Sequence, residues 1–277
     1  QQERVKLVTD NLTGNVTEYR HNSDNSVRES MKKNAEGGLI EKVEFTQDVY
    51  KRDKAAKKTD FTTGLVSNYQ YSKWGNLEKI ETVNSEGQKV GESTFELADH
   101  HYERIVSEKD LPKGTETRFQ YNQQGGLDRS ETVNRDGVQI EANIFTRNPD
   151  GTDAVTKTIN PLDNLVTDHL RNADGMLTES RTVNSKGTVI RSDKFAQGKN
   201  AREQVITTDL PLSGMQTTHT YDAVSGLLSE SVTTNLEKDV EIEKSTYEQG
   251  YDGEATLALR SDLLMLLQTN FKHNADT

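Results

Sequence analysis

The sequence predicts an all-β fold: an elongated, repetitive array of antiparallel β-hairpins that ends in a capping α-helix. Three observations predict it. A pattern of residues recurs every fifty positions, each copy holds four segments of alternating polar and apolar residues, and only 31% of the 277 residues are hydrophobic. A chain so poor in apolar side chains cannot fill a large compact interior, whereas an extended array needs only a thin core.

The repeat is visible as columns of similar residues at intervals of fifty. The clearest column holds Phe45, Phe95, Phe145 and Phe195. A second column is aromatic or imidazole throughout: Tyr19, Tyr69, Phe119, His169 and His219. Two positions later stand His21, Tyr71, Tyr121, Arg171 and Tyr221. Because the columns need no insertion, they indicate one unit that stacks on copies of itself. The copies lie near residues 14–63, 64–113, 114–163, 164–213 and 214–252.

Each copy is expected to contribute four β-strands. Segments that alternate polar with β-branched or aromatic residues occupy, in the second copy, residues 65–72, 77–84, 88–97 and 102–108. This period of two is typical of strands with one wetter face. Between the segments lie turn sequences, in which Asn-x-(Asp/Glu/Lys)-Gly runs supply glycine where a hairpin needs positive φ. Nearly five such copies predict roughly eighteen to twenty antiparallel strands.

The last residues break the repeat and predict a helix. Residues 253–273 carry apolar side chains at helical spacing: Leu259, Leu263, Leu266, Leu267 and Phe271. We therefore divide the chain into a β-repeat domain, residues 1–252, and a C-terminal α-helix, residues 253–277. The helix is expected to cap the last repeat, since an array must hide its exposed end. The alternative is that the helix docks on a partner.

A five-bladed β-propeller is the alternative architecture. Propeller blades also have four strands and a comparable length. They bury both faces of every blade, however, which requires more apolar residues than this chain has. A terminal helix also fits ring closure poorly. The open array is therefore the favoured prediction.

Several copies resemble a known bacterial repeat. The phrases are "YQYSKWGNLEKIETVNSEG" (69–87), "FQYNQQGGLDRSETVNRDG" (119–137) and "TYDAVSGLLSESV" (220–232). They resemble the Tyr-Asp (YD) repeats of RHS-type bacterial surface and toxin-shell proteins, approximately Y-x-Y-D-x-x-G-x-L. The matching residues are Tyr69, Tyr71, Gly75, Leu77, Tyr121, Gly125, Leu127, Tyr221, Asp222 and Leu227. The resemblance implies a bacterial β-repeat protein that is secreted, periplasmic or displayed on the cell surface. A chain that begins with Gln1 agrees with the expectation of a removed leader.

No catalytic motif stands out, so we expect neither an enzyme nor a cofactor. Nucleophile-elbow, Walker, zinc-protease and dinucleotide patterns are missing from the sequence. His169 and His219 share a column and could bind a metal together, but aromatic residues at the equivalent positions favour packing in a ladder. Asp150 and Asp153 give "NPDGTD" the look of a calcium loop, which a hairpin turn explains equally. A converging pair of carboxylates is the remaining enzymatic alternative.

Charge and composition limit the partners. A net charge of −11 argues against nucleic acid, which is bound through Lys and Arg. No run of roughly 18 apolar residues exists to span a membrane. Trp74, the one indole, could stack on a sugar or anchor a protein instead of packing over a neighbouring loop. The candidate partner contacts are Trp74, Tyr71, Tyr121, Tyr221, Leu263 and Leu267.

Together these features predict a non-enzymatic structural or binding repeat protein. It would act as a spacer or an interaction platform for a protein or glycan whose identity the sequence does not give. The alternative function is that of a carbohydrate-binding five-bladed propeller lectin.

Overall fold

The computed structural model describes residues 5–11, 13–99, 102–199, 202–250, 254–263, 265 and 267–270. The regular elements in these ranges are antiparallel β-strands, and no α-helix occurs among them, so the all-β prediction is confirmed. The chain divides into two compact units, Gln1–Gly125 with Ser130–Gln139, and Gly126–Arg129 with Ile140–Thr277. The division therefore cuts β11 (Leu127–Val133) and falls after the first residue of β12 (Gln139–Arg147).

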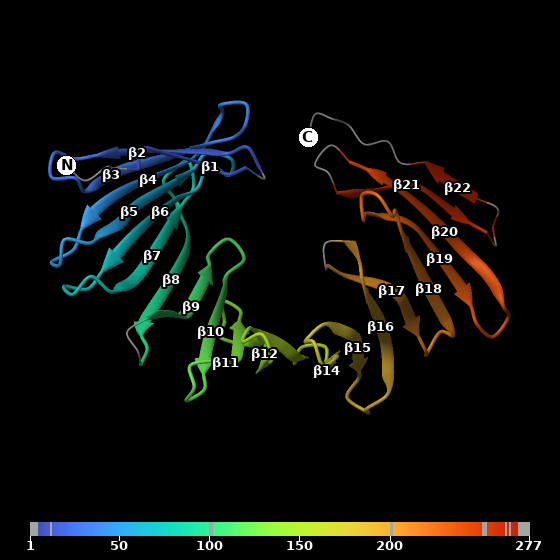
Figure 1. The fold of residues 1–277 in the computed structure, drawn as a ribbon. Coiled ribbons are helices and arrows are strands. Elements are labelled where there is room, and N and C mark those ends of the chain that lie inside the picture. Colours follow the sequence, from blue (N-terminus) through green and yellow to red (C-terminus); the bar gives the residue numbers. More distant parts are fainter. Residues whose placement is uncertain are drawn as a thin grey trace. The chain divides into compact units, whose positions relative to one another are not determined.

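The first unit is an antiparallel meander in which each strand pairs with the next in sequence (Figure 1, blue to green). Its strands are β1 (Leu7–Thr9), β2 (Val16–His21), β3 (Val27–Lys33), β4 (Leu39–Gln47), β5 (Asp53–Asp60), β6 (Val66–Tyr71), β7 (Leu77–Val83), β8 (Lys89–Leu97), β9 (Glu103–Asp110) and β10 (Thr115–Tyr121).

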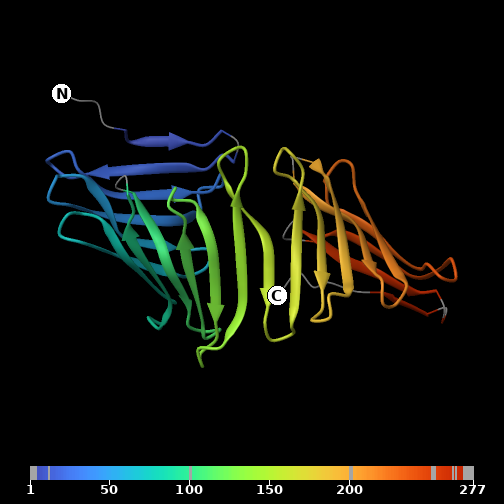
Figure 2. The same cartoon turned by 90° about the horizontal axis from the view of Figure 1, so that it is seen from below.

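The second unit repeats the arrangement (Figure 2). Its strands are β12 (Gln139–Arg147), β13 (Asp153–Asn160), β14 (Leu165–Arg171), β15 (Leu177–Val183), β16 (Val189–Gln197), β17 (Glu203–Leu210), β18 (Met215–Tyr221), β19 (Leu228–Asn235), β20 (Val240–Gln249), β21 (Ala255–Asp262) and β22 (Leu267–Asn270).

Successive copies of the repeat join edge to edge in the same ladder. Strand β5 closes the first copy and pairs with β6 of the second, with Lys57 opposite Asn68. Strands β17 and β18 join the fourth and fifth copies in the same way, with Thr207 opposite Thr218. Blades of a propeller are separate sheets, so hydrogen bonding across copy boundaries is the signature of an array. The predicted hairpin array is confirmed within each unit, and the five-bladed propeller is wrong.

The predicted C-terminal helix is also wrong. Residues 255–262 form β21, which pairs with β20 over seven positions, and residues 267–270 form β22, which pairs with β21. In β21, Leu257 and Leu259 alternate with less apolar residues, which is a strand pattern. The open edge of β20 offers a row of backbone donors and acceptors, and the chain satisfies them by adding strands. Leu266 and Phe271, part of the helical pattern, lie outside the described residues.

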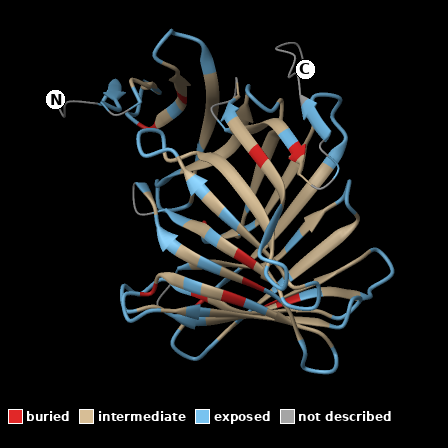
Figure 3. Cartoon of the chain, turned by 90° about the vertical axis from the view of Figure 1, so that its right-hand side faces the viewer, coloured by how far each residue is buried: buried red, intermediate tan, exposed pale blue. Residues whose placement is uncertain are grey.

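Each unit is a single layer with little enclosed core. Most described strand residues are of intermediate exposure (Figure 3). The buried apolar residues in the described ranges are all alanines, and the buried polar residues are serines and one threonine. A layer of this kind gains its stability from the backbone ladder and from cross-strand pairs of side chains. The low apolar content of the sequence fits this construction.

The repeated asparagine turns work as the sequence predicts. In the turn that starts at Asn134, the Oδ1 atom accepts hydrogen bonds from the N–H groups of Asp136 and Val138, both at 3.0 Å. The Gly137 N–H donates to the Asn134 carbonyl at 2.9 Å, and Gly137 has a φ of 76°. The turns at Asn84 and Asn184 repeat these bonds. The phrase that recurs most clearly in the sequence is therefore a hairpin turn.

Candidate interaction surface

The tyrosines that recur at intervals of fifty residues donate hydrogen bonds to the backbone of their own sheet. The Tyr71 hydroxyl on β6 donates to the Ala55 carbonyl on β5 at 2.8 Å. The register of β5 and β6 ends at Lys57 opposite Asn68, so the strands separate before they reach Ala55. The phenol reaches across that gap and satisfies a carbonyl that the neighbouring strand does not.

Two further tyrosines of the column repeat this bond. The Tyr121 hydroxyl donates to the Ile105 carbonyl at 2.7 Å, and the Tyr221 hydroxyl donates to the Val205 carbonyl at 2.9 Å. Burial raises the pKa of the Tyr71 and Tyr221 hydroxyls. The three hydroxyls are therefore occupied in the ladder. Their contact with a partner stays a prediction.

A second repeating contact was not predicted from the sequence. In four copies a carboxylate accepts a hydrogen bond from a backbone N–H two strands away. The bonds run from Val27 N–H to Asp53 at 2.9 Å, from Leu77 N–H to Glu103 at 3.3 Å, from Leu127 N–H to Asp153 at 2.9 Å, and from Leu177 N–H to Glu203 at 2.5 Å. The signal in the sequence was an acidic residue every fifty positions. It is weak because acidic residues are common throughout this chain.

The fourth copy has His169 in the aromatic or imidazole column, as the fifth copy has His219, and it has Arg171 two positions later. His169 Nε2 lies 3.0 Å from Thr158 Oγ1, and Nδ1 lies 2.8 Å from Ser180 Oγ. Burial lowers the pKa of His169, and the charge of Arg171 acts in the same direction. In the described part of the chain, no three His, Asp or Glu side chains gather as a metal site would require. The imidazole is held by hydroxyls, as one rung of the ladder.

The suspected calcium loop is a hairpin turn. Asp150 accepts hydrogen bonds from the N–H and hydroxyl of Thr152, at 2.9 and 2.7 Å. Asp153 accepts the Leu127 N–H, as described above. The Gly151 N–H donates to the Asn148 carbonyl at 2.9 Å. Both carboxylates are thus engaged within the fold.

Exposed aromatic and cationic side chains gather on two neighbouring turns of the first unit. We call this the turn-edge patch. It consists of Val49, Tyr50, Lys51, Arg52, Lys73 and Trp74. The exposed fractions of Val49, Tyr50 and Trp74 are 64%, 59% and 54%. The patch does not follow the repeat, because the corresponding turns of the later copies carry no indole. Trp74, predicted to contact a partner, lies at its centre.

One buried carboxylate holds the two turns of the patch together. The Asp48 side chain is only 4% exposed and accepts bonds from the Tyr50 N–H at 2.8 Å and from Arg52 Nε at 2.6 Å. Arg52 Nη2 then donates to the Trp74 carbonyl at 3.2 Å. Burial works to raise the pKa of Asp48, but these hydrogen bonds outweigh it and hold the pKa below its usual value. Gly75 allows the two turns to approach this closely, because a side chain at that position would collide with the side chain of Asp48.

Between the turns lies a hollow of about 220 Å³. Residues of both turns and of the adjoining strands line it, among them Val49, Lys54, Tyr71 and Lys73. Lys54 Nζ lies 5.7 Å from the Tyr71 ring centroid, and Lys73 Nζ lies 4.8 Å from that of Trp74. The ammonium groups thus stand over aromatic rings, a geometry of mutual attraction. A small group with negative charge would meet two cations there.

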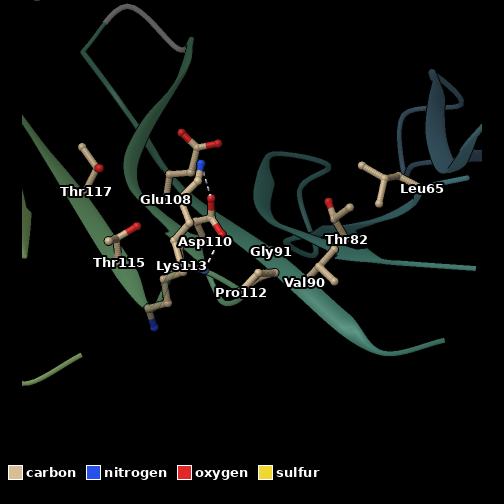
Figure 4. A pocket seen from close by; sticks show the side chains of 11 residues that line it. Leu65, Thr82, Val90, Gly91, Glu108, Asp110, Pro112, Lys113, Thr115 and Thr117 are labelled. Carbon is tan, nitrogen blue, oxygen red and sulfur yellow. Dashed lines mark hydrogen bonds and ion pairs between the residues drawn. The ribbon is translucent and has the colours of Figure 1, made fainter. Parts of the chain in front are cut away.

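A larger groove of about 760 Å³ lies elsewhere in the first unit (Figure 4). Gly91 forms part of its wall, whereas the equivalent positions of other copies carry the long side chains of Glu41, Glu141 and Arg191. Two acidic side chains, Glu108 and Asp110, and two basic ones, Lys109 and Lys113, line the groove. Lys113 lies 2.8 Å from Asp110, and Lys109 lies 3.4 Å from Glu92, which is outside the lining. The lining therefore carries no net charge by which a ligand would be recognised.

The two leucines predicted as partner contacts lie in the last hairpin of the second unit. Leu263 donates its backbone N–H to the Ile242 carbonyl at 2.9 Å. Leu267 begins β22, and 59% of it is exposed. They come from strands and a turn, where the sequence predicted a helix. Their contact with a partner stays a prediction. In the described residues no helix is long and apolar enough to cross a membrane.

Comparison with known proteins gives structural similarities of low score. A chain in the crystal structure of TcdB2-TccC3-TEV aligns with 90% of this chain at a TM-score of 0.44 and 12% identity. A chain in the crystal structure of TcdB2-TccC3-Cdc42 aligns with 92% of this chain at a TM-score of 0.38 and 12% identity. A porin-like protein from Bacteroides uniformis aligns with 92% of this chain and 91% of its own length, at 0.22 and 11%.

This chain spans 14% and 18% of the length of the chains from TcdB2-TccC3-TEV and TcdB2-TccC3-Cdc42. The resemblance of the repeats to those of RHS-type proteins stays a prediction from the sequence. No protein-family profile matches the chain, and no curated protein matches it in sequence.

Proposed function

We propose that this chain is a non-enzymatic repeat protein that serves as an interaction platform and binds a glycan through the turn-edge patch. One observation carries the proposal. Side chains that obey the fifty-residue period are occupied in holding the ladder, as the bonds of Tyr71, Tyr121 and Glu103 illustrate. Side chains that break the period, foremost Trp74 and Tyr50, are exposed together on two joined turns.

The chemistry of the patch suits binding. Exposed Trp, Tyr and Arg side chains carry much of the energy in protein interfaces because they bury large areas and lose little conformational freedom. The Asp48–Arg52 pair fixes both turns before a partner arrives, which lowers the entropic cost of association. Within the first unit, the hydrogen-bonded ladder holds the strands that carry the patch. The proposed setting is secreted, periplasmic or at the cell surface, and it rests on the resemblance of the repeats to those of bacterial surface proteins.

A glycan array that contains neutral and acidic saccharides tests the proposal with three proteins: the unaltered chain, Trp74→Ala and Leu212→Ala. Leu212 is the matched control, because it is 69% exposed on a turn outside the patch. We expect the unaltered chain and Leu212→Ala to bind the same glycans and Trp74→Ala to lose at least tenfold in affinity. All three should keep the same circular dichroism spectrum. Absence of glycan binding by the unaltered chain, or equal binding by Trp74→Ala, would overturn the proposal.

A further inference from the structure

Two junctions between copies lie inside the second unit, and both rest on short ladders. Strand β13 joins the third copy to β14 of the fourth, and β17 joins the fourth copy to β18 of the fifth, each over four paired positions. The strands on either side of the first junction pair over six positions, β12 with β13 and β14 with β15. A repeat array opens most easily where the fewest contacts must break, so the junctions are the places to compare.

The tyrosine bond reinforces one of these junctions and is missing from the other. At β17–β18 the Tyr221 hydroxyl reaches the Val205 carbonyl at 2.9 Å, beyond the paired positions. The fourth copy has Arg171 in place of the tyrosine. Its Nη1 atom donates to the Gly175 carbonyl at 2.8 Å and lies 3.3 Å from Glu203, and both partners lie on the side of β14 away from β13. Arg171 therefore does not bridge β13 and β14.

The turn of this junction also departs from the repeat. Before the first strand of the other copies the chain places glycine in the left-handed region, with φ between 63° and 70°, at Gly14, Gly64, Gly114 and Gly214. The fourth copy has Asn164 there, with a φ of 52°. Asparagine reaches this region more easily than most residues, but a Cβ atom adds strain that glycine avoids. The other described non-glycine residues with positive φ lie in turns within a copy: Asn25, Lys51 and Asp239.

A third feature of the junction is a missing backbone bond between its turn and the adjacent strand. At the first junction the Phe61 N–H donates to the Ile40 carbonyl on β4 at 3.0 Å, and Leu111 makes the equivalent bond at the second junction. The β13–β14 turn has Pro161 at this position, which carries no N–H. Pro211 removes the same bond at β17–β18. Of the four junctions between copies in the described ranges, β13–β14 alone lacks the tyrosine, the glycine and this N–H together.

The side-chain contacts across β13–β14 do not compensate. Lys157 Nζ lies 3.0 Å from Asp168, but these side chains are 40% and 44% exposed, and an exposed ion pair adds little stability. The hydroxyl of Thr158 lies 3.0 Å from His169 Nε2, and the same contact recurs across β17–β18 at 3.3 Å. Neither contact therefore offsets what the junction lacks.

We propose that the β13–β14 junction is the seam at which the second unit opens. Strands β12 and β13 separate there from β14, while the ladders on either side stay intact. The opened state leaves backbone donors and acceptors of β13 and β14 unpaired, as at the edge of a sheet. The inference is independent of the turn-edge patch, which belongs to the first unit.

Amide hydrogen exchange of the full chain, read by mass spectrometry at peptide resolution, tests the proposal without any variant. Protection factors of residues 157–160 and 165–168 report on β13–β14, and those of residues 207–210 and 215–218 report on β17–β18. We expect protection across β13–β14 to be lower by at least about fivefold, since a hydrogen bond that holds the other junction is missing there.

Substitutions at Arg171 isolate the missing hydroxyl. Arg171→Tyr places a phenol where it can reach the Val155 carbonyl, the counterpart of the Val205 carbonyl that Tyr221 binds. Arg171→Phe is the matched control, because it removes the same guanidinium and adds the same ring without the hydroxyl. We expect protection across β13–β14 to be about fivefold higher in Arg171→Tyr than in Arg171→Phe, and the two variants to be equal across β17–β18. Tyr221→Phe should lower the protection of β17–β18 by about the same factor.

Three results would overturn the proposal. The first is equal protection of the two junctions in the unaltered chain. The second is a pair of strands within a copy, such as β14 and β15, that exchanges faster than β13–β14. The third is equal protection of β13–β14 in Arg171→Tyr and Arg171→Phe, which would show that the hydroxyl is not what the junction lacks.

Discussion

Replacement of Tyr71 by Phe removes one oxygen atom and tests whether side chains hold the ladder together where its strands separate. The Tyr71 hydroxyl donates to the Ala55 carbonyl at 2.8 Å, at a point that the β5–β6 register does not reach. The variant keeps the aromatic ring, and with it the contact between the ring and the Lys54 ammonium group. The change therefore isolates the hydrogen bond from the packing of the ring.

The size of the effect follows from the position of the bond. A hydrogen bond of this kind contributes about 0.5–1.5 kcal/mol net, and a carbonyl left without a partner adds a penalty of about 1–3 kcal/mol when water cannot reach it. The side chain is half-buried, so water replaces part of the lost bond. We expect a loss of about 1–2 kcal/mol in the free energy of unfolding. With a urea m value of about 2 kcal/mol per M, the midpoint falls by roughly 0.5–1 M.

Urea unfolding followed by circular dichroism measures the loss, and amide hydrogen exchange locates it. Tyr69→Phe is the matched control, since Tyr69 lies on the same strand two residues away and its hydroxyl makes no hydrogen bond to a described residue. We expect the control to keep its midpoint and the exchange of β5 amides to accelerate in Tyr71→Phe alone. Equal midpoints for the two variants would show that the hydroxyl contributes nothing and that our account of the tyrosine column is mistaken.

Two other predictions concern the turns and the histidine rungs. Gly137→Ala should lower the free energy of unfolding by about 1 kcal/mol, because Gly137 has a φ of 76°, which alanine adopts only with strain. No neighbouring atom lies within 4 Å of the added Cβ, so backbone strain is the whole cost. An unchanged midpoint of urea unfolding would contradict this prediction. Burial lowers the pKa of His169 and His219 from 6.5, so the unfolded chain takes up protons first, and stability should fall as the pH drops below about 6.5. The double variant His169→Phe with His219→Phe should lose that part of the pH dependence. Melting temperatures between about pH 7 and pH 5 measure it. If the melting temperature of the variant falls with pH as steeply as that of the parent chain, the prediction is wrong.

Much of the fold could be predicted because the repeat shows the same turn residues and the same strand periodicity in several copies. The turn at Asn134 needs an acceptor side chain at its first position and glycine at its fourth, and both requirements stand in the sequence. Strand periodicity is equally local. A pattern that recurs at fixed spacing separates these requirements from chance, so strands and turns were found where the structure has them.

What could not be predicted depends on partners far away in the sequence. The leucines from Leu259 to Leu267 have a helical spacing, but residues 255–262 pair with β20 because that edge lacks another neighbour. Glu103 reaches the Leu77 N–H across an intervening strand, a contact that no local pattern encodes. Arg171 stands where three other copies carry Tyr, and its Nε is buried without a hydrogen-bond partner among the described residues, which nothing in the structure explains.

The turn-edge patch shows how a repeat protein separates framework from function. A tyrosine such as Tyr71 recurs in three copies, where its hydroxyl makes the same bond to the preceding strand. Lys51 is under no such constraint, and glycine would suit its turn better. Residues that depart from the period at a cost in backbone energy are therefore the ones whose presence the fold does not explain. In a single-layer sheet whose periodic side chains hold the ladder, such departures are the most direct physical guide to the binding surface.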